Sequence, residues 1–138
     1  MDMKVITRML EDEVYEASNE HGHRVIIDMR KMEDRKDQNP VELLLSSLSA
    51  CGAVDVTLML KKRKKTITDF QIETVGIRRD ETPKAFTKIN CHYRITSPDV
   101  TIDELNKVAK LALEKYCSVA SSLKAEITFS VEVNNLSL

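Results

Sequence analysis

Cysteine is the residue type in this 138-residue chain that is best suited to chemistry, and it occurs three times, as Cys51, Cys91 and Cys117. A cysteine thiolate can attack the O–O bond of a peroxide, and the cysteine then becomes a sulfenic acid. A second cysteine close by can condense with the sulfenic acid to form a disulfide, which an external thiol later reduces. Cys51 and Cys117 are candidates for such a pair, although the sequence does not give their distance. The competing interpretation of Cys51 is a small buried hydrophobe.

Cys91 lies in a segment, 85–95, whose residues alternate between apolar and polar types. Because Cys91 shares the apolar face with Ile89 and Tyr93, we expect it to lie in the core. The spacing of the three cysteines matches no compact zinc signature, and no ligand pair has the i, i+3 or i, i+4 spacing of a helix-borne site. A metal site formed by Cys51, Cys117 and a histidine therefore has little support, and we expect no metal.

The segment 39–62 must position Cys51, and its composition predicts a long helix. Asn39 is a good N-cap, and Pro40 suits the first helical turn, where its missing N–H has no partner. The basic run at 61–65 places positive charge at the end where the helix dipole is negative. The apolar residues extend nearly all round this helix, so we expect it to be largely buried, with a partner chain completing its enclosure.

The remaining sequence predicts strands and one more helix. Strand-like segments occur at 4–7, 13–18, 23–29, 67–78, 85–95 and 125–133. Residues 19–22 form a turn, and Thr101 with Glu104 forms a capping box at the start of the second helix. The predicted apolar face of that helix carries Leu105, Val108, Ala109, Ala112 and Tyr116. These elements lack regular βαβ alternation, which predicts an α+β fold.

Composition limits the classes of protein to consider. A chain of 138 residues that is 42% hydrophobic can form one domain with a real core, and we expect a single domain over 1–138. The net charge of -1 gives no electrostatic case for nucleic acid as a partner. No signal pattern opens the chain, and Asp55 interrupts the only long apolar run. We expect a soluble, cytoplasmic protein that does not associate with a membrane.

Several blocks of the sequence resemble those of one protein family. They are NPVELLL at 39–45, AC at 50–51 followed by DV at 55–56, RR at 78–79 before PKAFTKI at 83–89, and EKYCSV at 114–119. In this order they are similar to the signature blocks of the OsmC/Ohr family, and the resemblance covers nearly the whole chain. It is closest to an OsmC-like branch of that family.

The resemblance implies an OsmC-like α+β fold, with antiparallel sheets around two central helices in an intertwined homodimer. It also implies thiol-dependent, peroxiredoxin-like reduction of small organic hydroperoxides in defence against oxidative stress. Cys51 matches the attacking cysteine of the family, and Cys117 matches the resolving cysteine. No bound cofactor is implied; the reductant is an external dithiol, which is a lipoylated protein in the best-known branch. The substrate-binding residues are not identified.

The family peroxidases also pair an arginine with a glutamate near the reactive cysteine. Their glutamate directly follows the Asn-Pro pair, where this chain has Val41, and Glu42 comes one position later. In an unbroken helix, at about 100° per residue, Glu42 faces away from Cys51 unless a kink or a partner chain brings it back. Glu42 is nevertheless the candidate catalytic glutamate. The candidate arginines are Arg24, Arg30 and Arg79, and the alternative for each is a solvated surface residue.

Asp55 complicates the peroxidase interpretation. It follows Cys51 by four residues and so lies on the same helical face, where an unpaired carboxylate opposes ionisation of a thiol. This feature and the displaced glutamate favour a second hypothesis, a dimeric OsmC-like binding or redox-sensing protein without peroxidase turnover. Substitution of Cys51 distinguishes the two, because ligand binding survives it and turnover does not.

Overall fold

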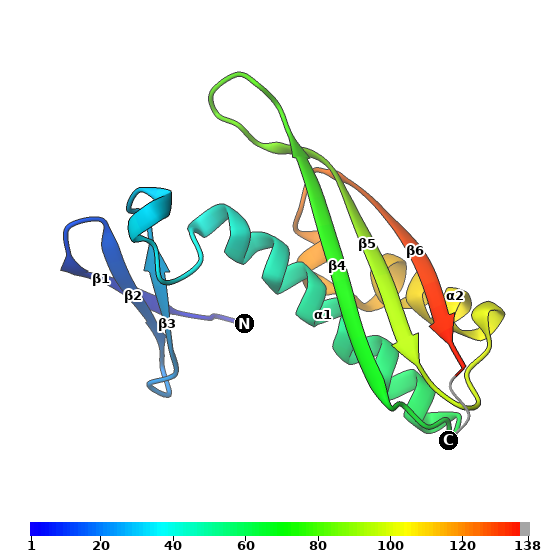
Figure 1. The fold of residues 1–138 in the computed structure, drawn as a ribbon. Coiled ribbons are helices and arrows are strands. Elements are labelled where there is room, and N and C mark those ends of the chain that lie inside the picture. Colours follow the sequence, from blue (N-terminus) through cyan, green and yellow to red (C-terminus); the bar gives the residue numbers. More distant parts are fainter. Residues whose placement is uncertain (136–138) are drawn as a thin grey trace. The chain divides into compact units, whose positions relative to one another are not determined.

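The computed structural model describes residues 1–135. They fall into two compact units, which divide between Leu44 and Leu45 (Figure 1). Each unit has its own three-stranded sheet. The expectation of one domain over residues 1–138 stays a prediction.

The first unit is built on an antiparallel sheet in the order β1-β2-β3. Its strands are β1 (Val5–Glu11), β2 (Val14–Asn19) and β3 (Arg24–Asp28). The predicted turn between β2 and β3 is confirmed, and Asn19 organises it by accepting hydrogen bonds at Oδ1 from the N–H groups of His21 and His23, at 2.9 and 3.0 Å. Gly22 has a φ of +80° in this turn, a conformation that favours glycine. A short 3₁₀ turn, η1 (Met32–Asp34), follows the sheet.

The long helix is α1 (Pro40–Lys62), which confirms the predicted segment. Asn39 and Glu42 form a reciprocal capping box at its start. The Glu42 N–H donates to Asn39 Oδ1 at 2.8 Å, and the Asn39 N–H donates to Glu42 Oε1 at 3.0 Å.

Only one narrow face of α1 is buried within the chain. Its buried residues recur every fourth position, at Leu48, Gly52, Val56 and Leu60. On the other side of the helix, Val54 is 55% exposed and Leu58 is 52% exposed. The prediction that a single chain leaves this helix incompletely covered therefore holds, and its enclosure by a partner chain stays a prediction.

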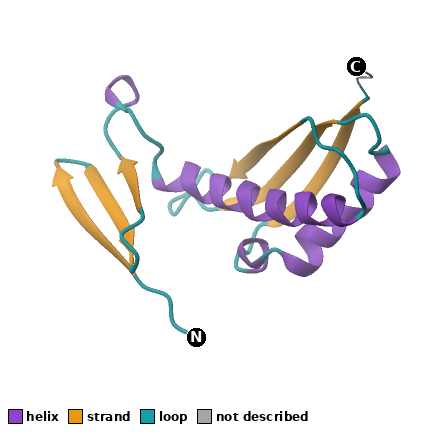
Figure 2. Ribbon diagram, turned by 90° about the horizontal axis from the view of Figure 1, so that it is seen from below, coloured by secondary structure: helices purple, strands orange, loops and turns teal. Residues whose placement is uncertain are grey.

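The second unit has a sheet in the order β4-β5-β6. Its strands are β4 (Asp69–Arg78), β5 (Phe86–Thr96) and β6 (Glu126–Asn134), and the helices α1 and α2 lie on one face of the sheet (Figure 2). β4 and β5 are antiparallel, but β5 and β6 are parallel. This pair departs from the expected antiparallel sheets because α2 (Ile102–Leu111) carries the chain from the end of β5 back to the start of β6.

The second helix ends in a turn that changes its register. Thr101 caps α2 by accepting a hydrogen bond at Oγ1 from the Glu104 N–H at 3.2 Å, as the sequence predicts. A π-helical turn, η2 (Ala112–Tyr116), then follows, closed by a bond of 2.7 Å from the Cys117 N–H to the Ala112 carbonyl. Because a π-turn places residue i+5 above residue i, Cys117 continues the buried face. The prediction that Tyr116 lies on that face is wrong, and its side chain is exposed.

The length and apolar composition of α1 also satisfy a criterion for a membrane span. An 18-residue window of the helix has a mean hydropathy of 1.8. The expectation that Asp55 interrupts the apolar run is wrong, because one carboxylate lowers the mean hydropathy of an 18-residue segment too little. The central helix of a soluble protein meets the same criterion, so length and composition alone assign this helix to no membrane.

Candidate active site

The structure brings the side chains of Cys51 and Cys117 together in the second unit. Cys51 lies in the middle of α1 and is half-buried, whereas Cys117 follows the π-turn and is 3% exposed. The Cys51 side chain helps to raise the pKa of the Cys117 thiol, which places the two cysteines close to each other. They are neighbours although most of the second unit separates them in the sequence, and both are free thiols.

Cys117 keeps its proton at neutral pH. Burial raises the pKa of the Cys117 thiol to about 11, and the hydrogen bond and charge of Cys51 act in the same direction. The N–H of Ala120 partly offsets this by donating to Cys117 Sγ at 3.4 Å.

Tyr93 completes the buried side of the site, whereas the sequence predicted for it only a place on the core face of a strand. Its side chain is fully buried, and its hydroxyl has no hydrogen-bond partner within residues 1–135. Burial raises the pKa of Tyr93, and the charges of Cys91, Cys117, Asp55 and Cys51 add to the effect. The close approach of Tyr93 to α1 is at Gly52, the residue that follows Cys51.

Because Gly52 has no side chain, Tyr93 can approach the helix α1 next to Cys51. A Cβ at position 52 would lie 2.5 Å from Tyr93 Oη, which is too close for two non-bonded atoms. A side chain at this position of α1 would therefore require the Tyr93 hydroxyl to move. The one sequence signal for this arrangement is the glycine that follows Cys51.

Cys91 is a core residue, as predicted. It is fully buried on β5, where burial raises the pKa of its thiol and a hydrogen bond with Thr74 partly offsets the increase. Thr74 Oγ1 in turn lies 2.5 Å from the hydroxyl of Ser49 on α1. This chain of polar contacts ties β5 and β4 to the helix within the second unit.

Glu42 has a defined structural role, which is the capping box with Asn39 at the start of α1. The helix runs without interruption from Pro40 to Lys62. A catalytic role for Glu42 stays a prediction.

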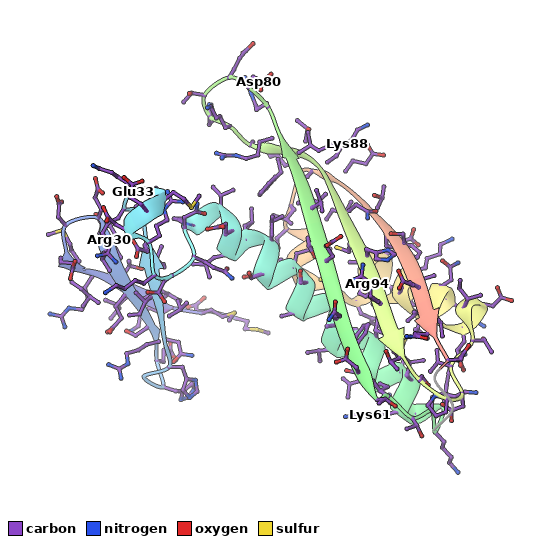
Figure 3. All side chains as sticks on the ribbon, viewed as in Figure 1. Arg30, Glu33, Lys61, Asp80, Lys88 and Arg94 are labelled. Atoms are coloured by element: carbon purple, nitrogen blue, oxygen red, sulfur yellow. The ribbon has the colours of Figure 1, made fainter. Side chains whose placement is uncertain are left out.

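Each candidate arginine pairs with a carboxylate of its own unit. Arg30, which is labelled in Figure 3, lies in the first unit. It binds the buried carboxylate of Asp28 through two bonds, from Nε to Oδ1 at 3.0 Å and from Nη2 to Oδ2 at 2.7 Å. These bonds hold the pKa of Asp28 well below its usual range. The other two pairs are Arg24 with Glu16 at 3.7 Å and Arg79 with Glu81 at 3.1 Å. Support of a thiolate by any of the three stays a prediction.

A hollow of about 230 Å³ lies beside α1 and the π-turn. It is lined by Asp55, Leu58, Met59, Lys62 and Tyr116. Asp55 is one helical turn beyond Cys51, and Tyr116 directly precedes Cys117, but neither cysteine lines the hollow. Within residues 1–135, no group of three His, Cys, Asp or Glu side chains is arranged to hold a metal ion.

Comparison with known proteins agrees with this fold. The family model described as OsmC-like protein matches residues 33–132, most of the chain. The chain therefore belongs to the OsmC-like proteins, and the α+β, OsmC-like fold expected from the sequence is confirmed.

The same comparison found individual proteins with a similar sequence or structure. Protein YhfA of Escherichia coli (strain K12) is 31% identical over 133 residues, which cover 95% of this chain and 98% of that protein. A hypothetical protein from Aquifex aeolicus VF5 has a solved structure with a TM-score of 0.84 and 29% identity, covering 97% of each chain. The organic hydroperoxide resistance protein OhrB of Bacillus subtilis has a TM-score of 0.62 and 18% identity, covering 97% of this chain and 98% of its own. At that identity OhrB shows a shared fold alone.

Proposed function

We propose that this protein reduces organic hydroperoxides, with Cys51 as the attacking cysteine and Cys117 as the resolving cysteine. The observation that carries the proposal is the proximity of the two cysteines, since the Cys51 side chain acts on the pKa of the Cys117 thiol. Proximity of the two sulfurs is what disulfide formation after oxidation requires. Membership of the OsmC-like proteins and the fold shared with an organic hydroperoxide resistance protein support the same chemistry.

The reaction has three steps. The Cys51 thiolate attacks the terminal oxygen of the hydroperoxide; the O–O bond breaks, the alkoxide takes up a proton to become the alcohol, and Cys51 becomes a sulfenic acid. The Cys117 sulfur then attacks the Cys51 sulfur, so that an S–S bond forms and water leaves. An external dithiol finally reduces this disulfide by exchange and is itself oxidised to a disulfide. No bound cofactor takes part.

The assignment of roles follows from the surroundings of the two cysteines. Half-buried Cys51 is the cysteine that solvent and substrate reach, whereas Cys117 is buried, stays protonated and lies close to Cys51. The hollow next to α1 offers an apolar wall, formed by Leu58 and Met59, for the organic group of the hydroperoxide. We therefore assign the organic part of the substrate to this hollow.

The proposal includes a homodimer in the cytoplasm, with a lipoylated protein as one dithiol reductant to test. The exposed Val54 and Leu58 on α1 supply an apolar surface for a second copy of the chain. Three free cysteines suit a reducing compartment, where thiols stay reduced. Sedimentation of the purified chain tests the dimer, because a monomer at micromolar concentration contradicts it.

The experiment that tests the activity is oxidation of the reduced protein by one equivalent of cumene hydroperoxide, tert-butyl hydroperoxide or H₂O₂. Mass spectrometry should show a Cys51–Cys117 disulfide that forms faster with the organic peroxides. Cys51→Ser should not react, and Cys117→Ser should stop at a sulfenic acid that dimedone traps. Cys91→Ala is the matched control and should behave like the natural chain. Cys51 that reacts no faster than free cysteine would contradict the proposal.

One observation favours a second function, an OsmC-like binding or redox-sensing protein without turnover. Arg24, Arg30 and Arg79 all pair with carboxylates, whereas Asp55 pairs with no cation in the described part of the chain. A carboxylate without such a partner on the Cys51 face of α1 opposes formation of the thiolate. Under this alternative, an apolar ligand binds to Cys51→Ser as tightly as to the natural chain, and the natural chain shows no multiple turnover with a dithiol.

A further inference from the structure

The buried hydroxyl of Tyr93 lacks the partner that such a group normally has. Most buried polar side chains in folded proteins form at least one hydrogen bond, so each exception needs a physical explanation. Tyr93 Oη is inaccessible to solvent and has no partner within residues 1–135. A phenylalanine would fill the same core position without this unpaired group.

The position of the hydroxyl points to the thiol pair. Oη approaches the backbone of α1 at Gly52, the residue that follows Cys51, and the absence of a Cβ at Gly52 makes the approach possible. The charges of Cys51 and Cys117 both act on the phenol. In the reduced protein the nearby sulfurs are poor acceptors for a phenol, but oxidation adds an oxygen atom to Cys51.

We propose that Tyr93 donates a hydrogen bond to the oxygen that Cys51 carries as a sulfenic acid, and thereby positions that oxygen as the leaving group in disulfide formation. The proposal rests on the proposed function, since the sulfenic acid arises when a hydroperoxide oxidises Cys51. It gives Tyr93 a hydrogen-bond partner in the oxidised protein that it lacks in the reduced one.

The step balances without a further reactant. The Cys117 sulfur attacks the Cys51 sulfur, the S–O bond of the sulfenic acid breaks, and the S–S bond forms. The departing hydroxyl combines with the thiol proton of Cys117 and leaves as water. Tyr93 keeps its own proton throughout, because its contribution is a hydrogen bond to the leaving oxygen. Burial raises the pKa of Tyr93, so the phenol remains a donor at neutral and mildly alkaline pH.

The test compares Tyr93→Phe with Tyr15→Phe, which removes the hydroxyl of a tyrosine on β2 in the first unit. Rapid mixing with one equivalent of cumene hydroperoxide should give an unchanged rate of sulfenic acid formation for both variants. Disulfide formation should be slower in Tyr93→Phe by on the order of a hundredfold, as for loss of one positioned donor. With excess hydroperoxide, Cys51 of Tyr93→Phe should also accumulate as sulfinic acid.

A spectroscopic measurement reports on the hydrogen bond itself. The chain has three tyrosines and no tryptophan, so tyrosine dominates its near-ultraviolet absorption. In a Cys117→Ser background, formation of the sulfenic acid should shift this absorption to longer wavelength as Tyr93 gains an acceptor. The shift should disappear when Tyr93→Phe is added and persist when Tyr15→Phe is added.

The outcomes separate this inference from the proposed function. Equal rates of disulfide formation in the natural chain and Tyr93→Phe overturn the role of Tyr93 and leave the peroxidase standing. Failure of the natural chain to form a sulfenic acid overturns the proposed function, on which the role of Tyr93 depends. If Tyr93→Phe does not fold, Gly52→Ala serves instead, because its Cβ displaces the hydroxyl and should slow disulfide formation in the same way.

Discussion

Replacement of Gly52 by alanine should destabilise this protein, although the same change stabilises most helices. In a helix interior, alanine is favoured over glycine by about 1 kcal/mol. Here the new Cβ would lie 2.5 Å from Tyr93 Oη, whereas ordinary contact begins at 3.4 Å. Overpacking of this kind typically costs about 1–3 kcal/mol. We therefore expect a net loss of roughly 0–2 kcal/mol in the free energy of unfolding.

The double variant Gly52→Ala/Tyr93→Phe isolates the cause of this loss. Without Oη, the nearest atoms to the new Cβ are Leu113 Cδ2 at 3.6 Å and Cζ of residue 93 at 3.7 Å, which are ordinary contacts. Alanine should then raise the free energy of unfolding by about 1 kcal/mol relative to Tyr93→Phe alone. Tyr93→Phe alone should be neutral or stabilising, because it removes a buried hydroxyl that has no partner.

Urea unfolding of the four reduced proteins, followed by circular dichroism, measures these differences by linear extrapolation. The sign of the glycine-to-alanine effect should change between the two backgrounds, which corresponds to a coupling energy of about 1–3 kcal/mol. Equal stabilisation by alanine in both backgrounds would refute the placement of the hydroxyl against α1. It would also remove the geometric basis for the role of Tyr93 at the thiol pair.

Three further perturbations have expected outcomes. The stability of the natural chain should fall as the pH drops below about 3.8, the ordinary pKa of Asp28, because Arg30 keeps the folded carboxylate ionised while the unfolded one takes up a proton. The variant Asp28→Asn should be less stable at neutral pH. It should also lack this pH dependence when unfolding in acid is followed by circular dichroism. In alkaline solution the free energy of unfolding should fall between about pH 9 and 11, because the unfolded Cys117 thiol ionises near 9.0 and the folded one near 11. Urea unfolding at a series of pH values measures this decrease, and the contribution of Cys117 to it should be absent in Cys117→Ser. Asp55→Asn should speed the reaction of Cys51 with cumene hydroperoxide a few-fold in stopped-flow measurements, since it removes a negative charge one helical turn away, and an unchanged rate would show that Asp55 does not act on this sulfur.

Local patterns in the sequence predicted most elements of the fold. Asn39 and Pro40 mark the start of α1 because capping depends on residues within one helical turn of each other. The alternation around Cys91 likewise predicted a buried residue on a strand, since the faces of a strand repeat every two residues. The fold class followed from the order of these elements.

Features that depend on register or on packing between distant segments were not predictable in this way. The sequence contains no signal for the π-turn, so α-helical spacing placed Tyr116 on the buried face that Cys117 occupies. The parallel pairing of β5 and β6 is also a property of the tertiary path. The resemblance of the cysteine blocks suggested that Cys51 and Cys117 act together, but only the structure shows Tyr93 beside them.

The π-turn also affects which changes in the number of codons before Cys117 are compatible with the fold. In an ordinary α-helical turn the residue above Ala112 is the fourth along the chain, and here it is the fifth, Cys117. A reading frame that lacked the codon for Tyr116 would deliver the same cysteine to the same face through an α-turn. Deletion of a single codon at this point is therefore compatible with the thiol pair, and alignments of the family should allow a one-residue gap immediately before the second cysteine.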